Sequence, residues 1–298
     1  MYVQFYLNNF LRTDCLKPKV KVVYSPYHRL HVGTGPELPE RVDVVWRSLE
    51  VEREIFEPKK ASEKQILKVH TKNFLDVVKK LDKKAKSLSQ YFFLVNNNKK
   101  YQRVIDGTCI VRGSFEAACY ACGSTIEAMK DVYKAVFVLL RPPSHHSHKN
   151  FTHGFCIFNN TCVGIENSKG RNKRILIVDL DLHFGDGVYF FFRKRKNIMY
   201  ISFSFIRLNK QLELLKRPTV KDLNNLVSSF DPQILYVILG YDSLDFGYMK
   251  PEEFFELLKN VLKHASSRKL VMELSGGYDQ NKLPTYVKKS LEMADKVL

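Results

Sequence analysis

The most regular feature of the chain is a series of short apolar runs that polar or turn-forming segments separate. Each run is four to six residues long and is rich in Val, Ile, Leu and Phe. Runs of this length, bounded by charged residues, Gly or Pro, are typical of strands that are buried on both faces of a sheet. They predict six strands: Val20–Tyr24, Ala135–Leu140, Ile175–Val178, Ile198–Phe203, Ile234–Leu239 and Leu270–Leu274.

Helical patterns lie between several of these strands. Ser62 and Gln65 form a capping-box pattern that opens one helix, and Ser114 is a capping-type residue at the start of the Ala-rich stretch to Lys130. Further helices are predicted at Glu40–Glu52, Asn73–Lys83, Pro251–His264 and Pro284 to the C-terminus. Strands that alternate with helices predict an α/β fold with a mostly parallel sheet. No linker, repeat or change in composition divides the 298 residues, so we expect one domain, residues 1–298.

Composition narrows the class of protein. Hydrophobic residues make up 45% of the chain, as in a packed globular protein. The apolar runs are far below the roughly 20 residues that cross a bilayer, and Met1 to Asp14 has no secretion-signal pattern. We therefore expect no membrane association and a cytoplasmic location. Cys119 and Cys122 are the only close pair among six cysteines, and we interpret them as buried thiols.

The formal net charge of +17 has three interpretations: binding of nucleic acid, binding of another anionic partner, or a solvated Lys-rich surface. The basic residues are spread along the chain, and no zinc-finger or RRM pattern collects them. The solvated surface is the favoured interpretation. Nucleic-acid binding stays open as an alternative, and the sequence does not indicate an oligomeric state.

Polar residues gather where the predicted strands end. His145 and His146 follow one strand, Asp179 ends the next, Asp242 follows a third, and Tyr278 follows the last with two glycines before it. In open α/β sheets the ligand crevice lies outside the carboxyl ends of the strands. We therefore expect these four loops to converge on one site.

The run from Val178 to His183 carries the strongest chemical signal. The strand period of two places Asp179, Asp181 and His183 on one side and the intervening leucines on the other. Buried carboxylates are costly unless something compensates them, and a cation does so. Asp181, His183 and Asp242 would suit a catalytic Zn²⁺, and Fe²⁺ is also compatible. The alternative is a salt-bridge network or a helix cap at a strand end.

The adjacent pair His145 and His146 also has several interpretations. A histidine pair can bind metal, or one ring can be a core residue bonded to the backbone. Beside a metal-activated water, however, a neutral imidazole is a suitable general base. Asp179 and Asp186 are available to orient the two rings.

These residues resemble the histone deacetylase and acetylpolyamine amidohydrolase superfamily, whose fold is arginase-like. The matching stretches are RPPSHHSHKNFTHGFCIFNN from Arg141, DLDLHFGDG from Asp179, LGYDSLDFG from Leu239 and SGGYD from Ser275, with weaker echoes in PELPER and VHTKNFLDVV. The resemblance covers most of the chain. It implies a single three-layer α/β domain and a zinc-dependent deacetylase that acts on linear amides.

The resemblance also implies residue roles. Asp181, His183 and Asp242 would be the metal ligands, His146 with Asp186 the general base, and His145 with Asp179 its electrostatic partner. Tyr278 would donate to the carbonyl oxygen, Phe155 would line the acyl channel, and the Gly154 carbonyl would accept from the substrate amide. A structural K⁺ site is implied at Asp179, Asp181, His183 and Ser202.

The chain departs from the family pattern in several places. Phe184 and Ser204 stand where histidines are usual, and Ser275 stands where a Glu is common. The stretch between Phe203 and Ile234 is short and lacks the loop that supplies a second aromatic wall, so we expect a wider gorge, with Phe205 as the candidate replacement.

Three functions follow from these observations. The favoured one is deacetylation of an acetylated protein, with a small acetylated amine such as an acetylpolyamine as the other substrate class. The alternatives are a catalytically weak or inactive binding protein with a basic surface, and an arginase-like binuclear hydrolase, for which further carboxylate ligands are lacking.

Overall fold

The computed structural model describes residues 18–33, 35–85, 92–93, 108–207 and 216–298. Its centre is a parallel sheet of seven strands in the order β2-β1-β5-β9-β8-β6-β7. The strands are β1 (Lys21–Tyr24), β2 (Ile55–Phe56), β5 (Ala135–Leu139), β6 (Ile175–Asp179), β7 (Ile198–Ser202), β8 (Ile234–Leu239) and β9 (Lys269–Leu274). All six predicted strands are present, each within one residue of its predicted ends.

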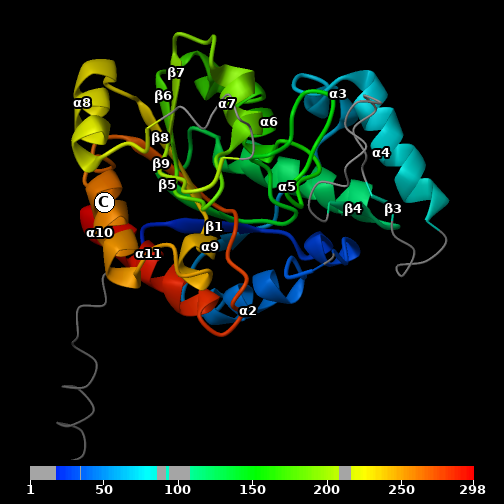
Figure 1. Cartoon of the computed structure of the whole chain (residues 1–298), viewed down its shortest axis with the longest axis horizontal. Helices are drawn as coiled ribbons and strands as arrows, with labels where there is room; N and C mark the ends of the chain where they lie inside the picture. Colours follow the sequence, from blue (N-terminus) through cyan, green and yellow to red (C-terminus); the bar gives the residue numbers. More distant parts are fainter. Residues whose placement is uncertain (1–17, 34, 86–91, 94–107, 208–215) are drawn as a thin grey trace, which may run out of the picture.

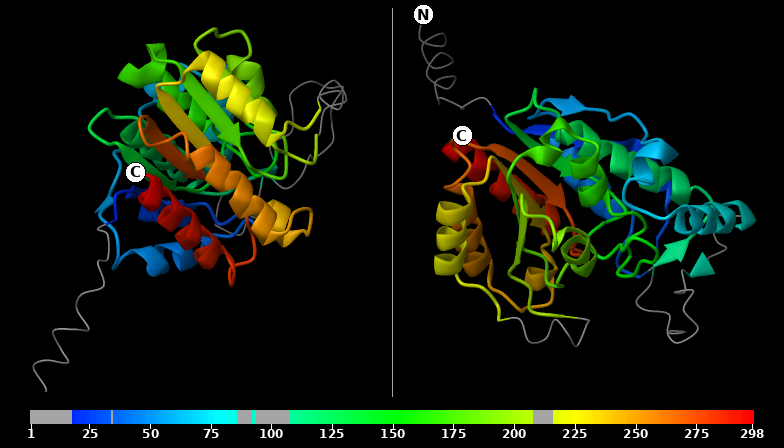
Figure 2. Two further views of the ribbon diagram at one scale, coloured as in Figure 1. Left: turned by 90° about the vertical axis from the view of Figure 1, so that its left-hand side faces the viewer. Right: turned by 90° about the horizontal axis from the view of Figure 1, so that it is seen from above.

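Helices cover both faces of the sheet (Figures 1 and 2). One face carries α2 (Glu40–Leu49), α8 (Val220–Phe230), α10 (Pro251–Leu262) and α11 (Leu283–Val297). The other carries α3 (Glu63–Ile66), α4 (Lys72–Lys84), α5 (Ser114–Ala128), α6 (Asn160–Glu166) and α7 (Asp186–Phe192). Smaller elements are η1 (Pro26–Leu30), η2 (Lys169–Asn172), α9 (Asp242–Asp245) and a two-stranded antiparallel pair, β3 (Phe92–Phe93) with β4 (Cys109–Ile110). The predicted three-layer α/β class is therefore confirmed, while the domain bounds 1–298 stay a prediction.

Alternating side chains of each strand build two separate cores. In β6, Leu176 and Val178 pack into the core under α8 and α10, whereas Ile175 and Ile177 pack into the core under α5 and α7. Strands β5, β8 and β9 divide their side chains in the same way. A strand with both faces buried needs apolar residues at every position, which explains the continuous apolar runs in the sequence.

Local signals placed most helix ends, with one correction. The Ser62–Gln65 capping box is present, although α3 is only one turn long. Ser114, in contrast, does not cap α5. The N-cap is Gly113, whose φ is 94°, and Ser114 Oγ instead accepts from Val111 N (2.9 Å) and lies 2.8 Å from His31 Nδ1. The serine thus connects the turn before α5 to the loop that carries His31, and its hydroxyl is not used to cap the helix.

The sequence did not predict α6, α7 or α8. Asn159 caps α6, and a capping box of Thr219 and Asp222 opens α8, so both helices carried recognisable start signals. Cys119 and Cys122 are buried free thiols, as expected. Among the described residues, no helix combines the length and the apolar composition that a bilayer crossing requires.

A buried histidine supports the loop that precedes α6. His70 is 2% exposed, its ring packs against those of Phe74 and Phe158, and its Nε2 accepts from Asn159 N at 2.9 Å. Burial lowers the pKa of His70 to about 4. Accepting a backbone hydrogen bond also requires a neutral ring, so protonation of His70 must oppose folding.

This histidine predicts a pH dependence of stability. The unfolded chain takes up a proton on His70 near pH 6.5 and the folded chain only near pH 4, so the free energy of unfolding falls as pH drops through this window. The expected loss is roughly 2–3 kcal/mol between pH 7 and 4.5. His70→Gln keeps an acceptor but does not titrate. Urea unfolding of both proteins should therefore show a smaller decrease in the variant, and parallel pH profiles would contradict this.

Candidate metal centre

The carboxyl ends of four neighbouring strands form the site. In sheet order these are β5, β9, β8 and β6. The loop after β5 carries His145 and His146, and the loop after β9 carries Tyr278. Asp242 begins α9 after β8, and Asp181 with His183 follows β6. Four loops that are far apart in the sequence converge because their strands are adjacent, as predicted.

Asp181, His183 and Asp242 come together in the way that a metal site requires. One ligand atom from each lies within 4.8 Å of the others. His183 Nδ1 is 3.2 Å from Asp242 Oδ2 and 3.5 Å from Asp181 Oδ1. The two carboxylates are 0–2% exposed. Although burial opposes a charged ring, hydrogen bonds to Asp181 and Asp242 raise the pKa of His183 to about 10. Positive charge is therefore strongly favoured at this point.

Glycines leave room beside these carboxylates. A Cβ at Gly276 would lie 2.6 Å from Asp242 Cγ, and a Cβ at Gly240 would lie 2.2 Å from Asp181 Oδ2. Only a residue without a side chain allows the backbone to approach so closely. Two buried carboxylates and an imidazole in a tight group are a suitable donor set for a divalent cation, and the observed spacing therefore fits one.

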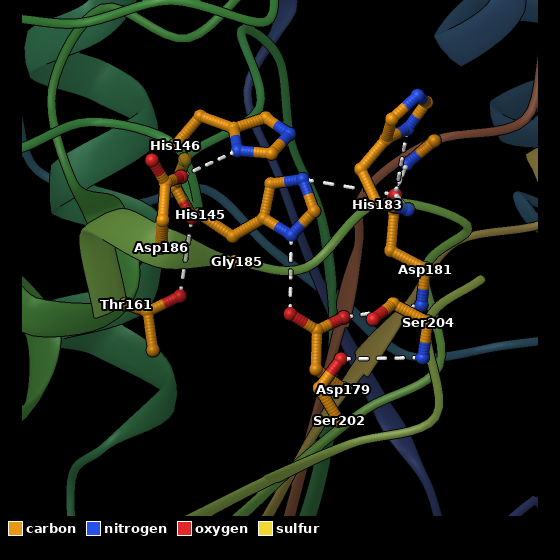
Figure 3. A network of polar contacts seen from close by, with 12 residues as sticks. His145, His146, Thr161, Asp179, Asp181, His183, Gly185, Asp186, Ser202 and Ser204 are labelled. Carbon is orange, nitrogen blue, oxygen red and sulfur yellow. Dashed lines mark hydrogen bonds and ion pairs between the residues drawn. The ribbon is translucent and has the colours of Figure 1, made fainter. Parts of the chain in front are cut away.

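Each histidine of the pair has its own carboxylate (Figure 3). His145 Nδ1 is 3.1 Å from Asp179 Oδ2, and His146 Nδ1 is 2.8 Å from Asp186 Oδ1. His145 Nε2 also lies 3.7 Å from Asp181 Oδ1. Both rings are 3% exposed. An ionised carboxylate can only accept, so the Nδ1 atom of each ring carries a proton. The pairings anticipated in the sequence are thus present.

The electrostatic surroundings shift the pKa values of the two rings in opposite directions. Burial disfavours a charge on His145, but Asp181 and Asp179 outweigh it and raise the pKa of His145 to about 9. Burial lowers the pKa of His146, and the nearby rings of His145 and His153 lower it further, against the effect of Asp186. His146 is therefore neutral at physiological pH and can accept a proton at Nε2.

A small cavity of about 90 Å³ opens onto this group. Phe155 and Tyr278 both line it, and their ring centroids are 5.9 Å apart in an edge-to-face arrangement. Burial raises the pKa of Tyr278, and Asp242 adds to the effect, so the hydroxyl stays protonated. The lining residues are Pro143, His145, His146, Gly154, Phe155, Asp181, His183, Ser275, Gly276 and Tyr278.

The candidate for a second aromatic wall, Phe205, is not at the cavity. Phe205 is absent from the lining residues; it packs under the Arg217 guanidinium, 3.8 Å from the ring centroid, and beside Tyr248. This corrects the suggestion that Phe205 replaces the missing wall. The physical reason is that a cationic and an aromatic partner hold its ring elsewhere. Residues 208–215 of the shortened stretch lie outside the described residues.

Tyr200 and Arg41 are two of the supporting residues that sequence reasoning missed. Tyr200 donates to Asp179 Oδ2 (2.7 Å) and accepts from Gly185 N (2.9 Å). It precedes Ser202 by two positions in β7, so strand alternation could have placed it on the site's face. Arg41, in the PELPER stretch, donates to the carbonyls of Ser275 and Gly277, and its guanidinium lies 5.0 Å from the Tyr278 ring centroid. It therefore holds the loop that carries Tyr278.

The residues predicted for K⁺ are also neighbours. Asp179 and Ser202 are paired in the β6–β7 register, and Asp181 N donates to Asp179 Oδ1 at 3.1 Å. His183 continues the same segment. The K⁺ site itself stays a prediction.

Comparison with known proteins identifies the family. A model of the histone deacetylase domain matches residues 35–205, which is more than half of the chain. The chain belongs to the histone deacetylase family. This deacetylase-family chain is 32% identical to Histone deacetylase 5 of Arabidopsis thaliana over 181 residues, covering 56% of this chain and 26% of that protein. It is 26% identical to Polyamine deacetylase HDAC10 of Danio rerio over 297 residues, covering 83% of this chain and 42% of that protein.

Solved structures support the fold of this deacetylase-family chain. Acetylpolyamine aminohydrolase from Burkholderia pseudomallei aligns with a TM-score of 0.76 at 18% identity, covering 93% of this chain and 99% of that one. The HDA15 HD domain aligns with a TM-score of 0.73 at 18% identity, covering 94% of this chain and 90% of that one. The chain spans about a quarter of the length of the Arabidopsis relative.

The packing of Gly154 against the His146 ring predicts a local effect. Gly154 has φ +59°, and a Cβ there would lie 2.2 Å from His146 Cδ2; Gly247 has φ +70° with nothing within 4 Å of such a Cβ. Gly247→Ala should therefore cost only the left-handed backbone penalty, about 1–2 kcal/mol. Gly154→Ala should cost more and displace the His146 ring. Denaturant unfolding measures the loss of stability, and the NMR signals of the His146 ring report its displacement. Equal losses of stability in the two variants would contradict the contact.

Proposed function

We propose that this protein is a zinc-dependent amidohydrolase that removes an acetyl group from an N-acetylated amine, with acetyl-lysine on a protein as the favoured substrate. The observation that carries the proposal is the convergence around one cavity of a compact Asp–His–Asp group, two histidine–carboxylate pairs and a tyrosine. Family membership supports the reaction class.

Asp181, His183 and Asp242 would hold the metal ion. Their buried carboxylates and the favourable position for positive charge fit Zn²⁺, and the same donors are compatible with Fe²⁺. When bound, such an ion supplies Lewis-acid polarisation of the amide carbonyl and makes a water molecule acidic near neutral pH. The neighbouring group Asp179, Asp181, His183 and Ser202 would take K⁺ as a structural ion.

His146 would act as the general base. Its Nδ1 proton is donated to Asp186, so its unprotonated Nε2 is available to take a proton from the attacking water. The same nitrogen would then return that proton to the leaving amine. His145, whose pKa the charges of Asp181 and Asp179 raise, would act as an electrostatic partner.

Tyr278, Phe155 and Gly154 would handle the acyl group. The protonated Tyr278 hydroxyl would donate to the carbonyl oxygen as it gains negative charge. The Phe155 ring would flank the lysine methylenes. The Gly154 carbonyl accepts a weak hydrogen bond from the Cys156 thiol (3.3 Å), and its oxygen has two lone pairs, so it could also accept from the substrate amide.

The charges near the cavity favour a protein substrate over a polyamine. Asp279 is paired with Lys282 at 3.1 Å, and Asp245 accepts from the backbone amides of Tyr278 and Asp279. These carboxylates are thus engaged within the protein, and the net charge of +17 repels polycations. Phe246 and Tyr248, which are 55% and 49% exposed, add apolar surface beside Tyr278 and Phe205.

The decisive experiment is an acyl-substrate panel on protein with a measured metal content. We expect cleavage of acetyl-lysine peptides, slower cleavage of acetylpolyamines, loss of activity with chelator and recovery with one equivalent of Zn²⁺. His146→Ala should reduce kcat by about 10² to 10⁴, the usual contribution of a general base. If metal-loaded protein cleaves no acylamide and His146→Ala changes nothing, the enzyme proposal fails. Two metal ions per active site would instead support a binuclear hydrolase.

Tyr278→Phe separates oxyanion stabilisation from packing. The variant keeps the ring and its contact with Phe155 but loses the hydroxyl donor. We expect kcat to fall by about 10² to 10³ with little change in KM, because the donor acts mainly on the developing charge. Tyr248→Phe, at a partly exposed ring, is the matched control and should change kcat less than twofold. Equal kinetics for the two variants would contradict a role for the Tyr278 hydroxyl.

A further inference from the structure

Asp186 has more partners than the orientation of one ring requires. Its Oδ1 accepts from His146 Nδ1 at 2.8 Å, while its Oδ2 accepts from His148 Nε2 at 2.9 Å and from His153 Nε2 at 2.8 Å. Although burial opposes a charged carboxyl, these three hydrogen bonds hold the pKa of Asp186 well below its usual range. Asp186 is therefore a carboxylate with three imidazole donors.

The loop between the histidine pair and Gly154 is folded so that its two further histidines meet at this carboxylate. His148 N donates to Phe151 O at 2.8 Å, which closes a turn, and the Phe151 ring stacks on the His148 ring with centroids 4.1 Å apart. The His153 ring lies 4.5 Å from the His146 ring at an interplanar angle of 30°. His153 and Asp186 are 6% and 8% exposed.

The backbone of Asp186 is also fixed in position. It begins α7, whose Val188 N donates to His145 O at 3.2 Å. A Cβ at Gly187 would lie 2.4 Å from Ser147 O, so the helix start sits directly against the turn that carries the histidine pair. The backbone thus fixes where Asp186 is, and the side-chain donors fix how its carboxylate is turned.

We propose that His148 and His153 are positioning residues that hold the Asp186 carboxylate in the plane in which it orients the His146 ring. A carboxylate with a single donor can rotate about its Cβ–Cγ bond, and its second oxygen would lack a partner in a buried site. Donors on both oxygens remove that freedom. The ring of His146 is then held with Nδ1 on Asp186 and Nε2 at the cavity.

This inference rests on the proposed function, because it assigns the two histidines to the catalytic base. A competing explanation is a second metal site, since one ligand atom each from His146, His153 and Asp186 lies within 4.8 Å of the others. Each Nε2 of His148 and His153 is, however, at hydrogen-bond distance from the carboxylate, as expected of N–H donors.

The test compares donor-removing and donor-keeping variants. A methionine has no N–H, whereas a glutamine amide places an N–H near the position of Nε2. We expect His153→Met and His148→Met each to lower kcat by roughly tenfold, a part of what a general base contributes, with KM unchanged within about twofold. His153→Gln and His148→Gln should retain kcat within about threefold. His264→Met, at a remote ring bonded to Asn224, is the matched control and should change nothing.

A second readout does not depend on activity. The Nδ1 proton of His146, bonded to a carboxylate, should give a far-downfield NMR signal that Asp186→Asn removes. We expect the double Gln variant to keep this signal and the double Met variant to shift or lose it. If the Gln variant keeps the signal and the Met variant shifts or loses it, but no substrate is cleaved, then the positioning role of His148 and His153 holds and the proposed function fails.

Three results would overturn the inference. One is an unchanged kcat and an unchanged signal in a folded double Met variant. Another is a loss of more than tenfold in kcat in a folded double Gln variant. This result decides the question if the Met variants do not fold. The third is binding of a second Zn²⁺ by the wild type that His153→Gln abolishes.

Discussion

Burial of negative charge is the constraint on which the rest of this site depends. Asp179, Asp181, Asp186 and Asp242 are 0–8% exposed, and all lie at one edge of the sheet. Such groups are tolerated only when hydrogen bonds and positive charges compensate them. His145 lies against Asp179 and Asp181, and His183 lies against Asp242. Three imidazoles donate to Asp186. A divalent cation held by Asp181, His183 and Asp242 would complete the same compensation.

The architecture of the sheet brings these charges together. Parallel strands point their carboxyl ends to one edge, and β5, β9, β8 and β6 are consecutive there. Their apolar side chains supply two cores, so the strands themselves leave no place for polar groups except at their ends. Glu273 is an exception within β9, where Ser144 (2.6 Å), Thr161 and Tyr236 donate to its buried carboxyl. Ser144 precedes His145, so this buried group also anchors the histidine turn.

Much of this arrangement could be predicted because its causes are local or periodic. Buried strands are visible as continuous apolar runs, and the position of Asp181 and His183 after such a run follows from the strand period. Asp242 and Asp186 were candidates from the residues alone, but only the motif resemblance gave them firm roles, because long-range pairing leaves no local signal. Tyr200 and His153 were missed because their partners are 21 and 33 residues away in sequence, although strand alternation would have placed Tyr200 on the face of the site. Ser114 misled the prediction because its hydroxyl had better partners in His31 and Val111 than in its own helix.

The two adjacent histidines show how surroundings, rather than residue type, assign chemical roles. His145 lies between Asp179 and Asp181, and their charges raise its pKa to about 9. His146 is one residue further on, where burial and two neighbouring rings lower its pKa. Asp186 opposes that decrease, but burial and the two neighbouring rings outweigh it. A cation bound to Asp181 would weaken the hold on the His145 proton. The proton affinities of the pair are therefore set by burial and by the charged groups that face each ring.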